Sequence, residues 1–313
     1  MKTKTVAAII GAKVNAWHES IDDEAVKALA KRDTIVTGGC IASMLLGEAV
    51  NDFDVYFATR ETVLAIANYY VSRFQPESRK GIPCAITVED NPDTGRVRIV
   101  VKSAGVASEE GTDKPYEYFE SRPAGEAQAY VADIMGTGAV EEAYEATEQQ
   151  ALNQDDDDKP KFRPVFLSTN AITLSQKVQI VLRFYGDADR IHENYDFVHC
   201  TNYWTAKDGV VLRQTALEAL ITRELRYVGS KYPVCSIMRL RKFIKRGWTI
   251  NAGQILKMIM QIDALDLTDL KVLEDQLTGV DCAYFVQVLE KLKDKDPTKI
   301  NTAYLVEIID RMF

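Results

Sequence analysis

The segment TIVTGGCIASMLLGEAVNDFDVYF, residues 34–57, carries the strongest fold signal in this chain. A short β-branched run ends in Gly38-Gly39, and the apolar stretch Cys40–Leu46 that follows contains neither glycine nor proline. This pattern predicts a strand, a tight turn and a helix. Asp52–Phe57 then alternates acidic and apolar residues, which is typical of a second strand. The order strand, turn, helix, strand indicates a layer of helices packed on a sheet.

The same segment places two carboxylates close to a glycine turn. On a strand, Asp52 and Asp54 project to one face, whereas Phe53 and Val55 project to the other. Glycines between a strand and a helix let the backbone approach a phosphate, and the helix N-terminus favours anions. Either feature alone is usually a plain turn or a solvated strand face, so the prediction depends on their order and spacing. Together they predict a site for an NTP complexed with Mg²⁺ or Mn²⁺.

The rest of the chain contains further periodic segments. Residues 1–32 and Thr62–Phe74 have helical spacing, and helical stretches are expected within Ala124–Gln150. Strands are predicted at Arg96–Lys102, Phe162–Leu167, Val178–Phe184 and Tyr195–Tyr203, with a helical turn at Asp187–Asn194. From residue 212 onward helices are predicted at Leu212–Tyr227, Cys235–Lys245, Gly253–Ile262, Leu267–Thr278, Ala283–Lys293 and Thr302–Met312.

These segments predict an α+β fold with two domains in the 313 residues. We expect a mixed sheet flanked by helices in residues 1–205, with an insertion at about 75–160, and an α-helical domain in residues 206–313. Charge is distributed unevenly, because residues 107–158 hold 15 acidic and 2 basic side chains, and residues 222–246 hold 8 basic and 1 acidic. The overall net charge of −8 argues against a general nucleic-acid-binding module.

The stretch GGCIASMLLGEAVNDFD, from Gly38 to Asp54, resembles the opening motif of DNA polymerase β-like nucleotidyltransferases. Within that superfamily it is most similar to class II CCA-adding enzymes and bacterial poly(A) polymerases, whose LLG it shares. The resemblance covers residues 30–75 well and residues 178–255 weakly. It implies that Asp52 and Asp54 are the paired metal ligands, and that Gly38 and Gly39 contact the incoming triphosphate.

One position of the motif departs from the family. Ala42-Ser43 stands where CCA-adding enzymes have an Arg-Asp pair, which argues against CCA addition. Ser43 is a candidate hydrogen-bond donor to a phosphate oxygen, or else a small buried helix residue. The superfamily usually has a third carboxylate on a neighbouring strand, and Asp196 is our candidate for it. A turn or N-cap role is the alternative for Asp196.

A second, looser similarity concerns Ser236–Ile250, which resembles the helix that ends the nucleotide-binding part of the same enzymes. It implies that Arg239, Arg241 and Lys242 contact the nucleotide, although basic residues on a helix are often only a solvated face. His192, His199 and Cys200 suggest zinc, but a fourth ligand with suitable spacing is missing.

The resemblance implies a two-metal nucleotidyltransferase that moves an NMP from an NTP to an acceptor hydroxyl and releases pyrophosphate. The acceptor is expected to be a tRNA-like RNA 3′ end, and a protein side chain in AMPylation-like chemistry or a small molecule is equally compatible with the superfamily. The alternative from another class is a catalytically silent binding or structural protein built on the same fold. Scattered cysteines and the absence of a membrane-length apolar stretch favour the cytoplasm. The inserted region and the C-terminal third also look like those of large bacteriophage proteins. For a phage-encoded protein, the expected location is the cytoplasm of the host cell.

Overall fold

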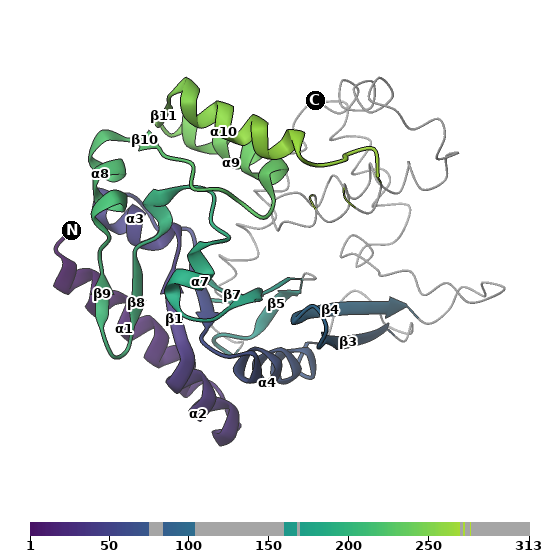
Figure 1. Ribbon diagram of the computed structural model, residues 1–313. Coiled ribbons are helices and arrows are strands. Elements are labelled where there is room, and N and C mark those ends of the chain that lie inside the picture. The colour runs from purple at the N-terminus through teal and green to yellow at the C-terminus, as the bar shows by residue number, and fades with distance from the viewer. Residues whose placement is uncertain (75–83, 104–159, 168–169, 270–271, 273–275, 277–313) are drawn as a thin grey trace, which may run out of the picture. The chain divides into compact units, whose positions relative to one another are not determined.

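The computed structural model describes residues 1–74, 84–103, 160–167, 170–269, 272 and 276 (Figure 1). They divide into two compact units. Unit 1 comprises the described parts of Met1–Ala127 and Thr147–His192, together with Cys200–Arg213. Unit 2 comprises Glu193–His199 and the described part of Gln214–Phe313.

Unit 1 is built on a seven-stranded sheet. The strands, in spatial order, are β5 (Pro164–Leu167), β6 (Ala171–Leu174), β7 (Val178–Tyr185), β2 (Phe53–Phe57), β1 (Thr34–Thr37), β8 (Tyr203–Thr205) and β9 (Gly209–Val211). β2 and β7 run parallel, and every other neighbouring pair in this sheet is antiparallel. The mixed sheet expected from the sequence is therefore confirmed.

The helices of unit 1 are α1 (Thr3–Glu19), α2 (Glu24–Asp33), α3 (Gly39–Leu46), α4 (Arg60–Val71) and α7 (Ala188–His192). β3 (Cys84–Asn91) and β4 (Arg96–Ser103) form a separate antiparallel ribbon. Asp23 caps α2 by accepting the N–H groups of Ala25 and Val26, and the Thr59 hydroxyl caps α4 in the same way. The predicted helical region 1–32 is thus two helices, because an acidic N-cap starts the second one.

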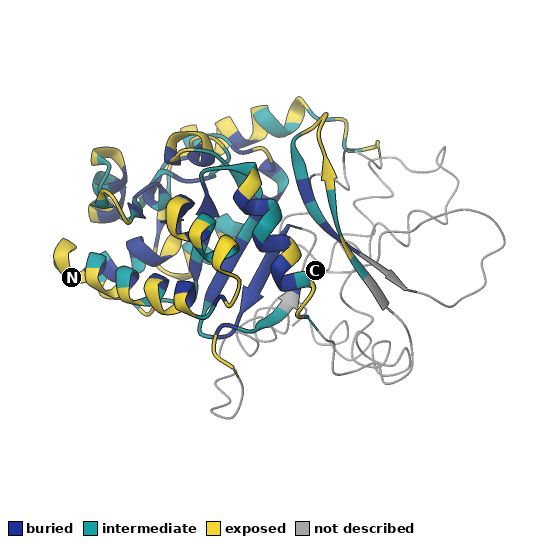
Figure 2. Cartoon of the chain, turned by 90° about the horizontal axis from the view of Figure 1, so that it is seen from below, coloured by how far each residue is buried: buried dark blue, intermediate teal, exposed yellow. Residues whose placement is uncertain are grey.

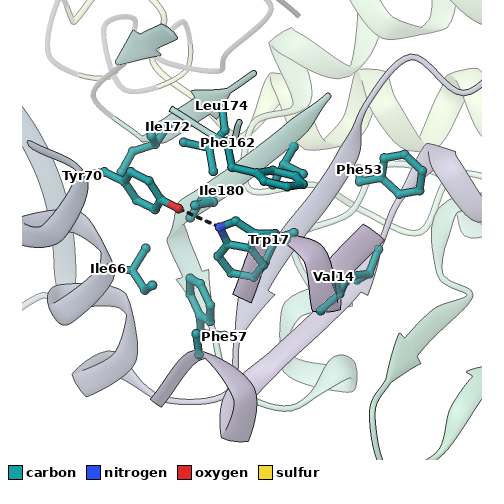
Figure 3. Close-up of a cluster of buried hydrophobic side chains, with 14 of the residues drawn as sticks. Val14, Trp17, Phe53, Phe57, Ile66, Tyr70, Phe162, Ile172, Leu174 and Ile180 are labelled. Atoms are coloured by element: carbon teal, nitrogen blue, oxygen red, sulfur yellow. Dashed lines mark hydrogen bonds between the residues drawn. The ribbon is translucent and has the colours of Figure 1, made fainter. Parts of the chain in front are cut away.

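One face of the sheet forms the core. Ile172, Ile180, Val55 and Val36 are paired in register across β6, β7, β2 and β1, and all four are buried. α1 and α4 contribute apolar side chains to the same core, where Trp17 donates its indole N–H to the hydroxyl of Tyr70 at 2.7 Å (Figure 3). Figure 2 shows these central strands in dark blue, while the outward sides of the helices are exposed.

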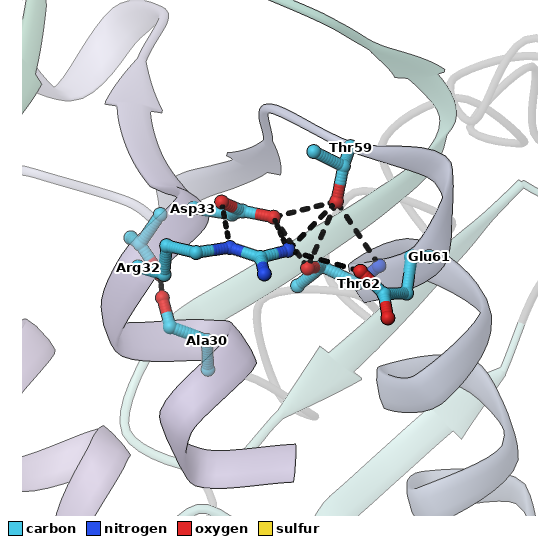
Figure 4. Close-up of polar contacts among 7 residues, drawn as sticks. Ala30, Arg32, Asp33, Thr59, Glu61 and Thr62 are labelled. Carbon is cyan, nitrogen blue, oxygen red and sulfur yellow. Dashed lines mark hydrogen bonds and ion pairs between the residues drawn. The ribbon is translucent and has the colours of Figure 1, made fainter. Parts of the chain in front are cut away.

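A buried carboxylate ties α2 to α4. Asp33 accepts hydrogen bonds from the Arg32 guanidinium at 2.8 Å and from the hydroxyls of Thr59 and Thr62, both at 2.5 Å (Figure 4). These donors, with Arg32 first, lower the pKa of Asp33 to about 2. The buried Asp33 carboxylate therefore has hydrogen-bond partners, and its role is to hold α2 and α4 together in unit 1.

Unit 2 contains α8 (Gln214–Thr222), β10 (Glu224–Leu225), α9 (Pro233–Lys245), β11 (Thr249–Ile250) and α10 (Ala252–Asp263). β10 and β11 form a short parallel pair. The helices predicted at Cys235–Lys245 and Gly253–Ile262 are confirmed within two residues at each end.

Two sequence predictions are wrong at this point of the chain. The strand predicted at Tyr195–Tyr203 is absent, and a 3₁₀ turn, Val198–Cys200, follows a single bridge between Phe197 and Tyr227. The helix predicted at Leu212–Tyr227 is only α8, and the chain leaves it at Arg223, whose φ is +49°. The physical reason is that the two segments pair with each other. The Val198 N–H donates to the Arg226 carbonyl and the Val228 N–H to the Asp196 carbonyl, on either side of the bridge between Phe197 and Tyr227.

Several other predictions can be compared with the described residues. β6, β8 and β9 were not predicted because they are only three or four residues long, and the eight-residue β3 was also not predicted. The predicted helices within Ala124–Gln150, at Ala283–Lys293 and Thr302–Met312, and most of Leu267–Thr278, lie outside the described residues. Among the helices of the described part of the chain, none is long and apolar enough to cross a bilayer.

Candidate functional site

The candidate site begins where β1 ends. Gly38 follows β1 with φ of +97° and ψ of −154°, a backbone conformation that is essentially restricted to glycine. Its N–H donates to the carbonyl of Cys200 at 3.1 Å, so this donor is already used inside the protein. α3 begins at the next residue, Gly39, and its first N–H groups have no acceptor within the helix. These N–H groups, rather than that of Gly38, are available to hold an anion.

The Asp54 side chain lies directly against this turn. A Cβ placed on Gly38 would collide with the Asp54 Oδ2 atom and would lie 3.3 Å from its Cγ atom. No such obstacle exists at Gly39, where a Cβ would meet no atom within 4 Å. Gly38 is therefore required by the approach of the Asp54 carboxylate as well as by its own backbone angles.

Asp52 and Asp54 share a neighbourhood with Cys40 on the first turn of α3. Burial raises the pKa of the Cys40 thiol, and the negative charges of Asp54 and then Asp52 raise it further. Phe53 and Val55 point into the apolar core, so the alternation predicted from the sequence is present in β2. Asp54 thus lies on the sheet face opposite the core, and Asp52 directly precedes β2.

A divalent cation fits this donor set. Two carboxylates from alternate strand positions, beside a turn with no Cβ, supply the hard oxygen ligands that Mg²⁺ and Mn²⁺ prefer. Among the described residues there is no cluster of three or more histidine, cysteine, aspartate or glutamate side chains suited to a metal. Within the described part of the chain, the candidate metal ligands at this turn are therefore the two carboxylates Asp52 and Asp54.

Asp54 belongs to a row of polar residues that crosses the sheet. Its members are cross-strand partners in register, and they are Thr173 on β6, Gln179 on β7, Asp54 on β2, Thr37 on β1 and Tyr203 on β8. Directly paired residues of neighbouring strands place their side chains on the same face. We call these five residues the polar row. It lies on the face opposite the core, and the sequence analysis identified only Asp54 among its members.

Thr37 anchors the end of β1 to two other segments. Its hydroxyl is 2.8 Å from His192 Nε2 on α7 and 2.9 Å from the carbonyl oxygen of Asn202. Burial lowers the pKa of His192 to about 4, so its ring is neutral near pH 7 and its Nε2–H can donate to Thr37. Thr37 can then donate to Asn202. This chain of hydrogen bonds holds the strand end from which the Gly38 turn departs.

Asp196, the sequence candidate for a third carboxylate, belongs to unit 2 and not to a strand. It is buried, and it accepts hydrogen bonds from the Ser236 hydroxyl at 2.9 Å and from the Arg239 guanidinium at 2.5 Å. The partner that its burial requires is thus an arginine of α9. The structure groups Asp196 with Ser236 and Arg239, and it groups Asp52 with Asp54 in unit 1.

The remaining predicted site residues are spread over two helices. Ser43 is half-buried on α3, one turn beyond Gly39, and its carbonyl oxygen accepts the N–H of Glu48 where the helix ends. On α9, Arg241 is exposed and Lys242 is half-buried. Arg239 pairs with Asp196.

His199 occupies an aromatic cluster of unit 2, in contact with Phe197, Phe243 and Trp248. It is 1% exposed, and burial lowers its pKa to about 4. The zinc site considered from the sequence finds no support among the described residues, where no group of three or more histidine, cysteine, aspartate or glutamate side chains is suited to a metal. His199 is better explained as a neutral core side chain.

These features define an α+β protein with a mixed sheet, in which a strand–turn–helix–strand unit presents a carboxylate pair beside a glycine turn. A family model described as Gad2, Gabija anti-defense 2 family protein, matches residues 9–223, which is more than half of the chain. The chain belongs to the Gabija anti-defense 2 family. The matched region includes the Gly38 turn, Asp52 and Asp54.

A curated relative, Gabija anti-defense 2 of Bacillus phage SPbetaL7, is 24% identical to this chain over 123 residues. The match covers 38% of this chain and 31% of the relative, so it spans less than a third of that protein. The relative is a bacteriophage protein, which agrees with the phage-like character of the sequence.

Similar solved structures include CCA-adding enzymes. The Bacillus stearothermophilus enzyme in complex with CTP is 13% identical, with a TM-score of 0.35, and the match covers 83% of this chain and 49% of that one. The Thermotoga maritima enzyme complexed with tRNA is 11% identical, with a TM-score of 0.37, and the match covers 91% of this chain and 51% of that one. Likenesses of this size do not establish a shared activity.

Proposed function

We propose that this protein is a metal-dependent nucleotidyltransferase whose activity counters the Gabija defence system. One observation carries the proposal, namely the Asp54 carboxylate packed against the Gly38 turn, with Asp52 two residues before it in the chain. The name of the family supports the second half of the proposal. The reaction forms a bond between an acceptor hydroxyl oxygen and the α-phosphorus of an NTP, and the bond to the bridging oxygen breaks as pyrophosphate leaves.

Each part of the site has a role in this reaction. Asp52 and Asp54 hold Mg²⁺ or Mn²⁺ through their carboxylate oxygens. A bound cation would supply charge neutralisation on the triphosphate and would favour ionisation of the acceptor hydroxyl. The N-terminal N–H groups of α3, beginning with Gly39, bind the phosphate oxygens, and Ser43 lies one turn further along that helix. Thr37 fixes the end of β1, so that the turn and the carboxylate keep their relative positions.

The acceptor has two candidates. An RNA 3′ end is supported by the motif from Gly38 to Asp54 and by the basic residues Arg241 and Lys242 on α9. A hydroxyl side chain of a protein component of the Gabija system is supported by the family to which the chain belongs. In both cases the acceptor supplies a hydroxyl, so the chemistry at Asp52 and Asp54 is the same.

The test is transfer of label from each α-labelled NTP in the presence of Mg²⁺ or Mn²⁺. Total tRNA and lysates of cells with and without the Gabija system serve as acceptors. We expect Asp52→Asn and Asp54→Asn to lower transfer by at least about 100-fold, because positioning and charge neutralisation provide most of the catalysis. Asp22→Asn, an exposed carboxylate of unit 1, is the matched control and should transfer label normally.

The same variants are then compared in phage infection of cells that carry the Gabija system. The proposal is supported if Asp52→Asn and Asp54→Asn both lose label transfer and no longer protect the phage from the Gabija system. If both variants overcome the defence as well as the unmodified protein does, the protein acts by binding, and the enzymatic proposal is wrong.

A further inference from the structure

Gln179 is the residue directly beside Asp54 on the neighbouring strand. β2 and β7 run parallel, and Asp54 is paired with Gln179 in their register. On the other side of β7, Gln179 is paired with Thr173 of β6. The position next to Asp54 on β7 is therefore taken by a neutral amide, whereas the sequence analysis had Asp196 as its candidate for a third carboxylate.

The side chain of Gln179 must point to the face that carries the carboxylates. Its neighbours Val178 and Ile180 are buried in the core of unit 1, and successive side chains of a strand point to opposite faces. Gln179 is nevertheless only 7% exposed. A primary amide that is removed from water needs polar partners, and on this face its neighbour across the strand pair is Asp54.

The chemistry of the amide suits a cation held by two carboxylates. The side-chain oxygen of glutamine is a hard, neutral ligand for Mg²⁺ or Mn²⁺, as are backbone carbonyls. Asp52 and Asp54 together carry two negative charges, which match one divalent cation. A third carboxylate at position 179 would add like-charge repulsion beside Asp54 in the absence of the cation.

We propose that Gln179 is a neutral oxygen ligand of the divalent cation bound by Asp52 and Asp54. This inference rests on the proposed function, because it concerns the same cation. It adds a residue to the site and predicts a two-carboxylate, one-amide ligand set in place of three carboxylates. It follows from the strand register and from burial.

The test is direct binding of Mn²⁺ to the full chain without nucleotide. Electron paramagnetic resonance measures the bound Mn²⁺, and Mg²⁺ serves as competitor. Gln179→Leu removes the oxygen and is expected to weaken Mn²⁺ binding by about tenfold or more. Gln179→Glu adds a charged oxygen and is expected to tighten the binding of free Mn²⁺ by about tenfold. Thr173→Val is the matched control, since Thr173 is in the polar row but one strand further from Asp54.

The possible outcomes separate this inference from the proposed function. Weaker binding in Gln179→Leu, with unchanged binding in Thr173→Val and an unchanged urea unfolding midpoint in both, supports the ligand role. If Asp52→Asn abolishes Mn²⁺ binding while Gln179→Leu and Gln179→Glu bind as the unmodified chain does, Gln179 is not a ligand, and the proposed function stands. If the unmodified chain binds no Mn²⁺, with or without NTP, the proposed function fails and this inference fails with it.

Discussion

Replacement of Gly38 by alanine tests the geometry on which the site depends. The backbone angles of Gly38 lie in a region that costs other residues about 1–3 kcal/mol. The new Cβ would also collide with the Asp54 carboxylate, and forcing an extra methyl into a packed site costs about 1–3 kcal/mol. Taking the middle of each range, we expect Gly38→Ala to lower the free energy of unfolding by about 4 kcal/mol.

Two other glycines of the same segment separate these contributions. Gly47 ends α3 with φ of +76° and has no atom within 4 Å of an added Cβ, so Gly47→Ala should cost only the backbone strain of about 1–2 kcal/mol. Gly39 begins α3 and has equally open space, so Gly39→Ala should be close to neutral for stability. The expected order of stability is therefore Gly39→Ala, then Gly47→Ala, then Gly38→Ala.

The assay is urea unfolding monitored by tryptophan fluorescence, which reports on the buried Trp17 and Trp204 of unit 1 and on Trp248 of unit 2, combined with Mn²⁺ binding. If Asp54 moves to relieve the collision, part of the stability returns but Mn²⁺ affinity falls. The reasoning is refuted if Gly38→Ala unfolds at the same urea concentration as Gly39→Ala and also binds Mn²⁺ as the unmodified chain does.

Three further predictions concern the surroundings of the site. Tyr70→Phe removes the acceptor of the buried Trp17 indole and should cost about 1–3 kcal/mol in urea unfolding, and an unchanged midpoint would contradict this hydrogen bond. Arg239→Met leaves Asp196 buried without its charged partner and should destabilise unit 2 by about 3 kcal/mol or more at neutral pH, and a stability equal to that of the unmodified chain would show that the pair is dispensable. Burial lowers the pKa of His199 from 6.5 to about 4, so the unfolded chain binds the proton more tightly. The stability associated with the neutral ring is complete above pH 6.5 and is lost as the pH falls towards 4, by about 3 kcal/mol. Between pH 7 and pH 4 the His199→Phe variant should therefore lose about 3 kcal/mol less of its free energy of unfolding than the unmodified chain does. Identical acid unfolding curves for the variant and the unmodified chain would exclude the effect.

The local parts of the site were predictable from the sequence. The strand at Thr34–Thr37, the helix from Cys40 and the strand at Asp52–Phe57 are all present, with shifts of one residue at most. Their signals are the β-branched run, the glycine turn and the alternation of acidic and apolar residues, and these act between residues that are close in the chain. The elements of α9 and α10 were predictable for the same reason.

The error at Asp196 illustrates what local patterns lack. Its apolar surroundings read as a strand, but the segment is held as a turn by backbone hydrogen bonds to residues around Tyr227 and by the side chains of Ser236 and Arg239. All of these partners are distant in the sequence. Periodicity describes which side of a segment is apolar, and it does not say which segment packs there.

By itself the sequence determined an α+β unit in which a glycine turn and a helix precede a strand that carries Asp54 on the face away from Phe53 and Val55. The tertiary structure alone decided that Gly38 gives its N–H to Cys200, that Thr37 is tied to His192, and that Gln179 lies next to Asp54. The physical reason is that strand register joins segments far apart in the chain. It is set by the packing of the whole core, and no pattern within either strand contains it.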